Sequence, residues 1–250
     1  MSIVSFEKYQ GNGNDFVIVN NCELSEKQIQ QFCNRNYGVG SDGFMNLFFE
    51  NNVLNVKFYN PDGSESFCGN GSRCAIKYAA KNLGFKSGEK FSAFDGYHIA
   101  EINHDSVSIE MFVRSEIKAF DGFDFINTGA PHAVKKVSDL EQLNIIKSAK
   151  HIRYHDAFQP IGTNVNFYEE IEPNHIKIRT FEKGVEAETL ACGTGVTACA
   201  LVYKSNNVNA NHVIKVDTLG GQLSVNTNDN NIYLTGGAEF VFKGEINLNG

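Results

Sequence analysis

The chain has 250 residues, of which 42% are hydrophobic and 20% are charged, and its formal net charge is −7 at pH 7. That length allows one large domain or two smaller ones with a sizeable core. The acidic balance argues against nucleic acid and against an anionic membrane surface as partners, and no apolar run approaches the ~20 residues of a membrane span. Residues 1–8 lack a basic segment followed by an apolar stretch, so we expect a cytoplasmic protein.

The first half of the chain is predicted to contain two helices and a strand between them. One helix begins at Ser25, because Ser25 and Gln28 have the spacing of a capping box. Segment 53–59 alternates partly between apolar and polar residues, which indicates a strand. The second helix follows the glycine-rich turn 68–71, has apolar residues three and four positions apart, and ends before Gly84.

The rest of the chain is predicted to contain similar elements. Strands are expected at 107–111, 176–179 and 232–234. A helix is expected to start at Ser138, with Glu141 in the capping position, and another follows the glycine-rich turn 192–195. The segment 213–225 indicates a hairpin, because a Gly-Gly pair separates two alternating runs.

Two turns share one pattern, a cysteine followed by Gly-x-Gly and a helix: Cys68-Gly69-Asn70-Gly71 and Cys192-Gly193-Thr194-Gly195. They lie about half a chain apart, which predicts two pseudo-equivalent lobes and not a solenoid with its shorter repeats. No linker rich in Ser, Gly or Pro separates the halves, so we expect the lobes to pack directly. An interface of this kind is a usual place for a ligand cleft.

A cysteine just before a helix has a chemical consequence. The first turn of a helix exposes unpaired N–H groups and the positive end of the dipole, which favour a thiolate and can also hold a carboxylate. Glycines let the backbone approach a ligand closely. Two facing turns would hold a planar carbanion between two thiols, so that a proton lost to one thiol is regained from the other. The pattern therefore predicts inversion of a stereocentre, at a carbon whose hydrogen is only a very weak acid.

The other cysteines, Cys22, Cys33, Cys74 and Cys199, are expected to be reduced thiols. Cys74 and Cys199 fall within the two helices that follow the turns, where packing is the simpler role. No Cys-x-x-Cys occurs, so no zinc site is expected. A different class of protein remains open, a non-catalytic binding protein whose thiols form a structural disulfide.

Seven ordered motifs resemble those of the diaminopimelate epimerase family. They are Gly11–Phe16, Gly38–Gly43, Asn60–Glu65, Thr128–His132, Gly162–Phe167, Glu182–Gly195 and Thr235–Ile246. The resemblance implies interconversion of LL- and meso-2,6-diaminopimelate, in lysine and peptidoglycan precursor synthesis, without cofactor or metal. It also implies a homodimer.

The implied fold is α/β (α+β), with two pseudo-symmetric lobes, each a curved, mostly antiparallel sheet wrapped around a central helix. Residues 1–115 plus 240–250 would form the lobe with Cys68, and residues 116–239 the lobe with Cys192. The C-terminal strand would return to the first lobe, and the active site would lie in the cleft between the two.

The resemblance also implies roles for individual residues of this chain. Cys68 and Cys192 correspond to the acid/base pair, and His132 and Glu182 to polar residues beside the thiols. Four residues of the two turns would hold the carboxylate of the reacting centre: Gly69, Asn70, Gly193 and Thr194. The amino and carboxylate groups of the substrate, including its far end, would be bound by Asn14, Asn60, Asn164, Glu182 and Lys183.

Two positions depart from the family pattern. Lys183 stands where the family usually has Arg, and a Lys offers a point charge in place of a bidentate fork. Ala130 stands where a hydrogen-bonding residue, often Asn, is expected. Both concern the far end of the substrate, so a racemase of another amino acid on the same scaffold, including a proline-type substrate, is the nearest rival. The related phenazine-pathway isomerases use a carboxylate in place of the thiols, which the two Cys turns argue against.

Overall fold

The computed structural model describes residues 2–228 and 231–248. Contacts within the chain divide it into two compact units, Met1–Ile109 with Gly236–Gly250, and Glu110–Thr235. These bounds lie a few residues before the lobe boundaries that the sequence suggested. The second unit is continuous in sequence, whereas the first is completed by a strand from the end of the chain.

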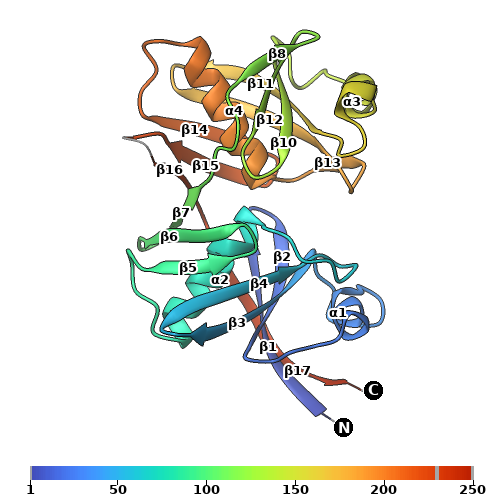
Figure 1. Ribbon diagram of the computed structural model, residues 1–250, viewed down its shortest axis with the longest axis vertical. Helices are drawn as coiled ribbons and strands as arrows, with labels where there is room; N and C mark the ends of the chain where they lie inside the picture. Colours follow the sequence, from blue (N-terminus) through green and yellow to red (C-terminus); the bar gives the residue numbers. More distant parts are fainter. Residues whose placement is uncertain (1, 229–230, 249–250) are drawn as a thin grey trace. The chain divides into compact units, whose positions relative to one another are not determined.

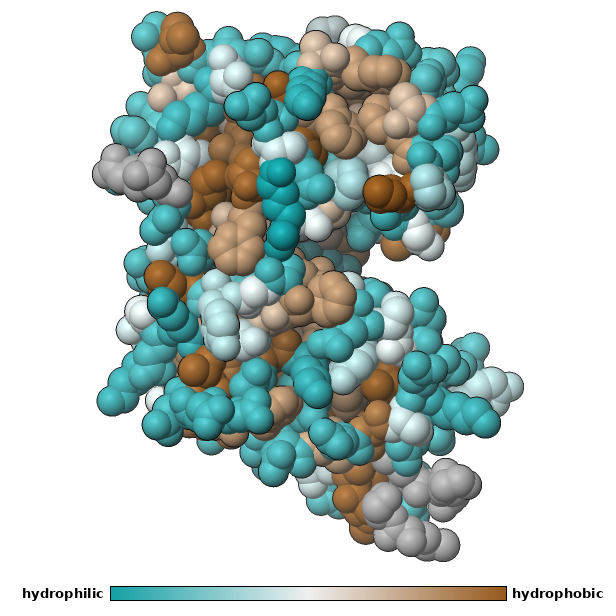
Figure 2. Space-filling model, in the orientation of Figure 1, coloured by the Kyte–Doolittle hydropathy of each residue, from teal (hydrophilic) through white to brown (hydrophobic). Residues whose placement is uncertain are grey.

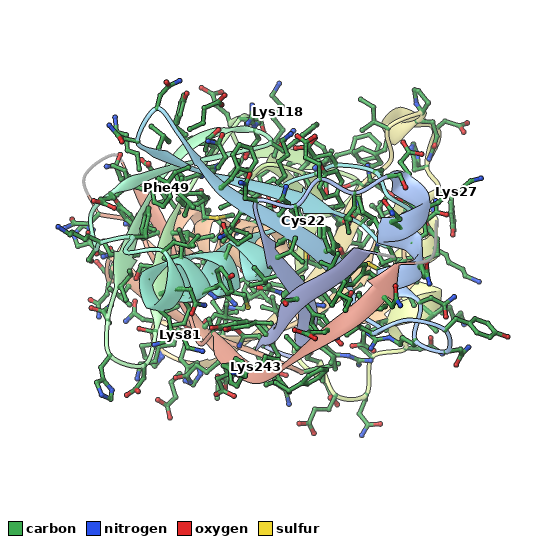
Figure 3. All side chains as sticks on the ribbon, turned by 90° about the horizontal axis from the view of Figure 1, so that it is seen from below. Cys22, Lys27, Phe49, Lys81, Lys118 and Lys243 are labelled. Atoms are coloured by element: carbon green, nitrogen blue, oxygen red, sulfur yellow. The ribbon has the colours of Figure 1, made fainter. Side chains whose placement is uncertain are left out.

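The strands of the first unit are β1 (Ser2–Gly11), β2 (Asn14–Asn20), β3 (Gly43–Glu50), β4 (Val53–Tyr59), β5 (Lys90–Ala93), β6 (Gly96–Ile102) and β17 (Glu239–Leu248). From β1 to β6 the pairs alternate: β1–β2, β3–β4 and β5–β6 are antiparallel, and β2–β3 and β4–β5 are parallel. The strand β17 pairs antiparallel with β1 over most of its length, and the two run side by side in Figure 3, where Lys243 marks β17.

The strands of the second unit are β8 (Lys118–Phe120), β9 (Phe123–Asn127), β10 (Pro131–Lys136), β11 (Asn164–Glu172), β12 (His175–Glu182), β13 (Ala187–Thr189), β14 (Val213–Thr218), β15 (Gly221–Asn226) and β16 (Ile232–Gly236). The alternation of the first unit recurs: β9–β10, β11–β12 and β14–β15 are antiparallel, and β10–β11 and β12–β14 are parallel. The chain passes from one unit to the other at β7 (Val107–Met111). Two units with the same pairing pattern confirm the pseudo-symmetry that the paired turns predicted.

Each unit has one central helix and one outer helix (Figure 1). The central helices are α2 (Gly69–Asn82) and α4 (Gly193–Asn206). The helix α2 packs against β1, β2, β3, β4, β6 and β17, and α4 packs against β9, β10, β11, β12, β14 and β15. Because strands surround each central helix, the expectation of a curved sheet wrapped around a helix is confirmed.

The outer helices are α1 (Glu26–Cys33), on β3, and α3 (Ile145–Arg153), on β11 and β12. The first starts where the sequence predicts, and the Gln28 side chain accepts a hydrogen bond from the Ser25 backbone N–H at 2.9 Å. The prediction of a helix start at Ser138 is wrong. The helix begins only after Asn144, whose side chain accepts from the Lys147 N–H at 3.1 Å, because an Asn cap serves the same orphan N–H groups as a Ser cap.

The core of each unit is apolar and well covered. The first unit gathers Val17, Phe32 and Phe44, among others, in one cluster, and the second gathers Ala133, Ile152 and Val165. Hydrophilic residues cover most of the face seen in Figure 2, with a few apolar patches between them. None of the helices in the described ranges combines the length and apolar character that a membrane crossing needs.

Candidate active site

Both cysteines of the two turns cap the central helices. Cys68 is the N-cap of α2 and Cys192 the N-cap of α4, with similar extended backbone angles of φ −133°, ψ 111° and φ −119°, ψ 109°. The Cys68 Sγ accepts a hydrogen bond from the Gly71 N–H at 3.4 Å, and the Cys192 Sγ lies 3.4 Å from the Thr194 hydroxyl. Each sulfur therefore lies at the positive end of a helix dipole, where a negative charge is stabilised.

In the first unit, the turn at Cys68 is linked to the β1–β2 hairpin. The Asn70 amide donates to the Asn14 side-chain oxygen at 2.6 Å, and the Asn14 amide donates to an Asp42 carboxylate oxygen at 3.2 Å. Asn14 directly follows the two-residue turn Asn12-Gly13, both in the left-handed region with φ 53° and 84°. Turns of this type match the twist of the flanking strands, so the hairpin fixes the position of Asn14.

A buried cation lies beneath the same turn. Arg73 is fully buried, and its guanidinium donates to the side-chain oxygens of Asn12 and Asn70 at 2.6 and 3.0 Å. It also bonds to the backbone oxygens of Gly69 and Gly237. Among the residues that the structure describes, no carboxylate pairs with Arg73. Burial lowers the pKa of Arg73 to about 10, so the guanidinium stays protonated near neutral pH and favours an anion at the start of α2.

Asn60 belongs to a separate hydrogen-bond set. Its amide donates to the Ser64 and Ser66 hydroxyls at 3.0 and 3.1 Å. The side chain thus stabilises the loop that leads from β4 to Cys68, and the role in substrate binding that the resemblance implies remains a prediction.

In the second unit, a chain of hydrogen bonds runs from Cys192 into the core. The Thr194 hydroxyl lies 3.4 Å from the Cys192 Sγ and 2.9 Å from the His132 Nε2. The other ring nitrogen, Nδ1, lies 3.0 Å from the Asn166 side-chain nitrogen. His132 is fully buried, and burial lowers its pKa to about 3. His132 is therefore neutral at ordinary pH.

The remaining predicted residues lie near the ends of β11 and β12. The Asn164 side-chain oxygen accepts from the Lys183 N–H at 2.9 Å, and the Glu182 carboxylate accepts from the Thr189 hydroxyl at 2.9 Å. The Lys183 ammonium donates to the Ile161 carbonyl at 3.0 Å. Asn164, Glu182 and Lys183 are thus brought together locally, with the lysine charge directed at a neutral backbone oxygen.

Sequence reasoning missed three residues that hold these side chains. Arg73 and Asn12 connect the Cys68 turn to its hairpin, and Asn166 contacts His132. One signal was available for Asn166, a polar residue between the apolar residues Val165 and Phe167. For Arg73 the signal was an arginine among the small and apolar residues of a central helix.

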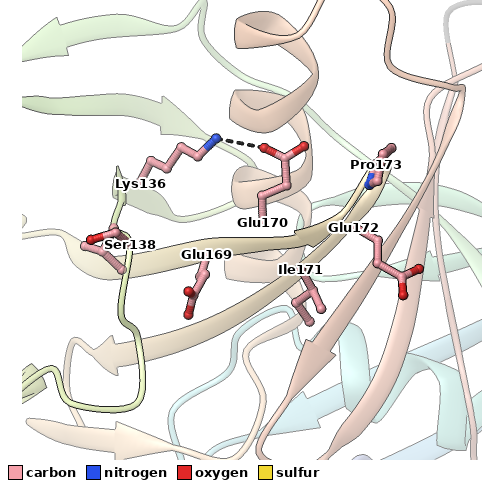
Figure 4. A pocket seen from close by; sticks show the side chains of 8 residues that line it. Lys136, Ser138, Glu169, Glu170, Ile171, Glu172 and Pro173 are labelled. Atoms are coloured by element: carbon pink, nitrogen blue, oxygen red, sulfur yellow. Dashed lines mark hydrogen bonds and ion pairs between the residues drawn. The ribbon is translucent and has the colours of Figure 1, made fainter.

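One hollow of the described surface lies away from these residues. A cavity of about 890 Å³ is lined by Lys136, Val137, Ser138 and residues 169–173. Figure 4 shows its one ion pair among the residues drawn, between Lys136 and Glu170 at 2.8 Å. None of the predicted site residues lines this hollow.

Two further thiols are buried within the central helices. All six cysteines are free, and Cys74 and Cys199 are fully buried. Burial raises the pKa of Cys74 to about 12 and raises that of Cys199 further, so both stay protonated and pack as small apolar groups, as expected. Within the described ranges, no three His, Cys, Asp or Glu side chains are arranged to hold a metal ion.

Comparison with known proteins identifies the family of this chain. The family model described as "Diaminopimelate epimerase" matches residues 6–111 and 125–241. The chain is 39% identical over 252 residues to a diaminopimelate epimerase of Flavobacterium psychrophilum, covering 96% of this chain and 98% of that one. It is 36% identical over 272 residues to a diaminopimelate epimerase of Aquifex aeolicus, covering 97% and 98%.

Among solved structures, a phenazine biosynthesis protein of the PhzF family from Enterococcus faecalis superposes with a TM-score of 0.75 at 13% identity. The match covers 99% of this chain and 100% of that one, which shows a shared fold. The family match and the two full-length relatives go further than the fold. On their strength, the chain belongs to the diaminopimelate epimerase family and is an isomerase.

Proposed function

We propose that the protein interconverts LL- and meso-2,6-diaminopimelate by proton transfer between the substrate α-carbon and two thiols, those of Cys68 and Cys192. The observation that carries the proposal is that these two cysteines cap equivalent central helices, one in each unit. The proposal includes a cofactor-free reaction, a cytoplasmic homodimer and a place in lysine and peptidoglycan precursor synthesis.

In the proposed step, one cysteine is a thiolate and the other a thiol. The thiolate takes the α-hydrogen as a proton, so the C–H bond breaks and an S–H bond forms. The second thiol then gives its proton to the opposite face of the planar carbanion, which inverts the centre. After one turnover the proton is on the sulfur that began as the thiolate. The reverse reaction therefore uses the two cysteines in exchanged roles.

The site must lower the free-energy barrier to formation of the carbanion. Enzymes lower barriers by roughly 8–23 kcal/mol, while one helix terminus contributes about 0.3–1 kcal/mol when exposed and up to ~2 kcal/mol when partly buried. The proposal therefore requires that both helix N-termini meet the substrate in a closed, dry site, because electrostatic stabilisation grows when water is excluded.

Incubation of the reduced protein with LL-diaminopimelate in deuterated water tests the proposal. We expect deuterium at the α-carbon together with the meso isomer, because the thiols exchange with solvent before they return a proton. Cys68→Ala and Cys192→Ala are each expected to lower kcat by at least ~10²-fold, the lower end of what a positioned acid or base contributes. A folded wild-type protein that yields neither deuterium nor meso isomer would remove the proposed function.

The second candidate is a racemase of another amino acid. Lys183 favours it, because its ammonium donates to the Ile161 carbonyl and offers no fork for a far carboxylate. Parallel assays with diaminopimelate, proline and a panel of other L-amino acids separate the candidates. If another amino acid is deuterated at its α-carbon faster than diaminopimelate is, the result favours the racemase of that amino acid.

A further inference from the structure

A polar trio lies beneath the Cys192 turn at positions that are apolar in the other unit. Asn166 on β11 faces Thr180 on β12, and the Thr180 hydroxyl donates to the Asn166 side-chain oxygen at 3.0 Å. His132 on the neighbouring strand β10 completes the trio. All three side chains are buried, with exposed fractions of 0 to 2%.

The equivalent layer of the first unit can be read from strand register. Met45 pairs with Phe58 across β3–β4 as Asn166 pairs with Thr180 across β11–β12. Phe16 on β2 stands two positions before the partner of Met45, as His132 stands two before the partner of Asn166. The Phe16 and Phe58 rings pack edge to face at 6.0 Å. An apolar layer of this shape is thus compatible with the fold, and burying polar groups costs free energy unless each is hydrogen-bonded, so stability alone does not account for the trio.

The hydrogen-bond partners fix the orientation of the Asn166 amide. Its nitrogen lies 3.2 Å from the Ala133 carbonyl oxygen, which can only accept. The nitrogen must therefore face Ala133, and the amide oxygen is left for the Thr180 hydroxyl. The same nitrogen lies 3.0 Å from the His132 Nδ1. Since the amide nitrogen can only donate, Nδ1 accepts, and the single proton of the neutral imidazole is on Nε2.

The tautomer of His132 affects the Cys192 sulfur through the Thr194 hydroxyl. The His132 Nε2–H donates to the Thr194 hydroxyl oxygen at 2.9 Å, which leaves the hydroxyl hydrogen for the Cys192 Sγ at 3.4 Å. We propose that Asn166 is a positioning residue that holds His132 in its Nε2–H tautomer and thereby directs the Thr194 hydroxyl hydrogen at the Cys192 sulfur. No proton leaves His132. The relay stabilises the Cys192 thiolate, and its value for catalysis rests on the proposed two-thiol function.

The close approach of α4 to the trio supports this role. A Cβ added to Gly195 would lie 2.6 Å from the Asn166 side-chain oxygen and 3.4 Å from the His132 ring. Because Gly195 has no side chain, the first turn of α4 packs directly against Asn166 and His132. At the equivalent Gly71, a Cβ would meet nothing closer than 3.3 Å. The groups that face His132 are Asn166 and Thr194, by hydrogen bond, and the Lys183 ammonium, which acts through its charge and lowers the His132 pKa further.

The test is a two-bond ¹H–¹⁵N correlation spectrum of the histidine rings in the ligand-free ¹⁵N-labelled protein, because the pattern of cross-peaks distinguishes the two tautomers. We expect His132 in the Nε2–H form from pH 5 to pH 8. In Asn166→Asp a carboxylate oxygen accepts where the amide donated, so the single ring hydrogen moves from Nε2 to Nδ1, and the Thr194 hydroxyl then donates to Nε2 and not to the Cys192 sulfur. The kcat for epimerisation is expected to fall at least ~10-fold, with a smaller change in KM, as for loss of one hydrogen bond to a charged group.

Two controls distinguish a change in the His132 tautomer from a general disturbance of the structure. Thr180→Val removes one hydrogen bond of the same trio but leaves the amide nitrogen facing Ala133, so His132 should keep the Nε2–H pattern. His98, a second buried histidine that bonds to Asp95 at 2.8 Å, should give unchanged signals in both variants.

The inference is overturned if wild-type His132 carries its proton on Nδ1, a result that needs no variant to fold. It is also overturned if N166D leaves the Nε2–H pattern in place. The tautomer is read without substrate, so an Nε2–H pattern in a protein that does not deuterate diaminopimelate removes the proposed function and leaves the role of Asn166 standing.

Discussion

The buried groups nearest the two cysteines differ in charge. Beneath Cys68 lies the protonated guanidinium of Arg73, held by neutral oxygens. Beneath Cys192 lies the neutral ring of His132, reached through Thr194. Negative charge on the first turn thus lies near a buried cation, whereas negative charge at Cys192 lies near the Thr194 hydroxyl and, behind it, a neutral ring. The two turns share one sequence pattern, but the buried side chain beneath the first is charged and the one beneath the second is neutral.

The neutral His132 gives a prediction for acid stability. Its pKa lies near 3 in the folded protein against an ordinary 6.5, so below about pH 6.5 the unfolded chain binds a proton that the folded chain does not. The stabilisation is present above pH 6.5 and is lost as the pH falls toward 3, with a slope of at most about 1.4 kcal/mol per pH unit for one proton.

We expect His132→Gln to lose less stability than the wild type between pH 7 and pH 4.5, as measured by urea unfolding at each pH. His104→Gln is the control, because the His104 side chain is 95% exposed, and it should behave as the wild type does. An equal loss in wild type and His132→Gln would contradict a buried neutral imidazole.

At the scale of elements, the first turns of α2 and α4 tolerate different side chains. Gly71 and Gly195 occupy the same place after their cysteines, but an added Cβ meets the Asn166 oxygen only at Gly195. We expect Gly71→Ala to change the free energy of unfolding by less than about 1 kcal/mol, since better helix propensity offsets slight crowding. Gly195→Ala should cost about 1–3 kcal/mol, as overpacking does.

Thermal or urea unfolding of both variants, with kcat measured alongside, checks this prediction. Because Gly195→Ala displaces α4 from the His132–Asn166 pair, its kcat should fall further than that of Gly71→Ala. Equal effects of the two substitutions would mean that the turns are interchangeable.

Elements were predictable from sequence where the signal is local. The capping box at Ser25 and the glycine-rich turns place α1, α2 and α4, because a cap acts within one helical turn. The start of α3 was misplaced because Ser138 and Asn144 are both good caps, and only the packing of Ile145, Ala149 and Ile152 decides between them.

The sequence predicted that Cys68 and Cys192 precede two helices, and the resemblance named His132, but the hydrogen bonds that surround His132 were not predictable. Cys68 and Cys192 are defined by the residues that follow them in the chain. The trio of His132, Asn166 and Thr180 is assembled from three strands, so it depends on sheet register, which a single sequence does not reveal.

At the scale of the whole molecule, the two units differ in how the chain builds them. The second is one continuous stretch, Glu110–Thr235, whereas the first needs Gly236–Gly250. We expect residues 110–235 expressed alone to unfold cooperatively on heating, because a unit of this size with its own apolar core can fold by itself.

Residues 1–109 alone should lack a cooperative transition, because β1 loses its partner β17. Thermal unfolding of each fragment, followed by circular dichroism, measures whether its transition is cooperative. Addition of a synthetic peptide of residues 236–250 should restore the cooperative transition of fragment 1–109. Equally cooperative melts of both fragments without the peptide would contradict this dependence on β17.

The bond from Arg73 to the Gly237 carbonyl has a consequence for the order of events during synthesis. Cys68 and its helix leave the ribosome when more than half of the chain is still unmade, yet the cation beneath them is anchored by a residue that follows the entire second unit. Domains tend to fold as units while the chain emerges, N-terminal part first. The Arg73 guanidinium therefore gains its last hydrogen-bond partner only after the second unit has been made, and we expect a nascent chain to complete the Cys192 turn before the Cys68 turn.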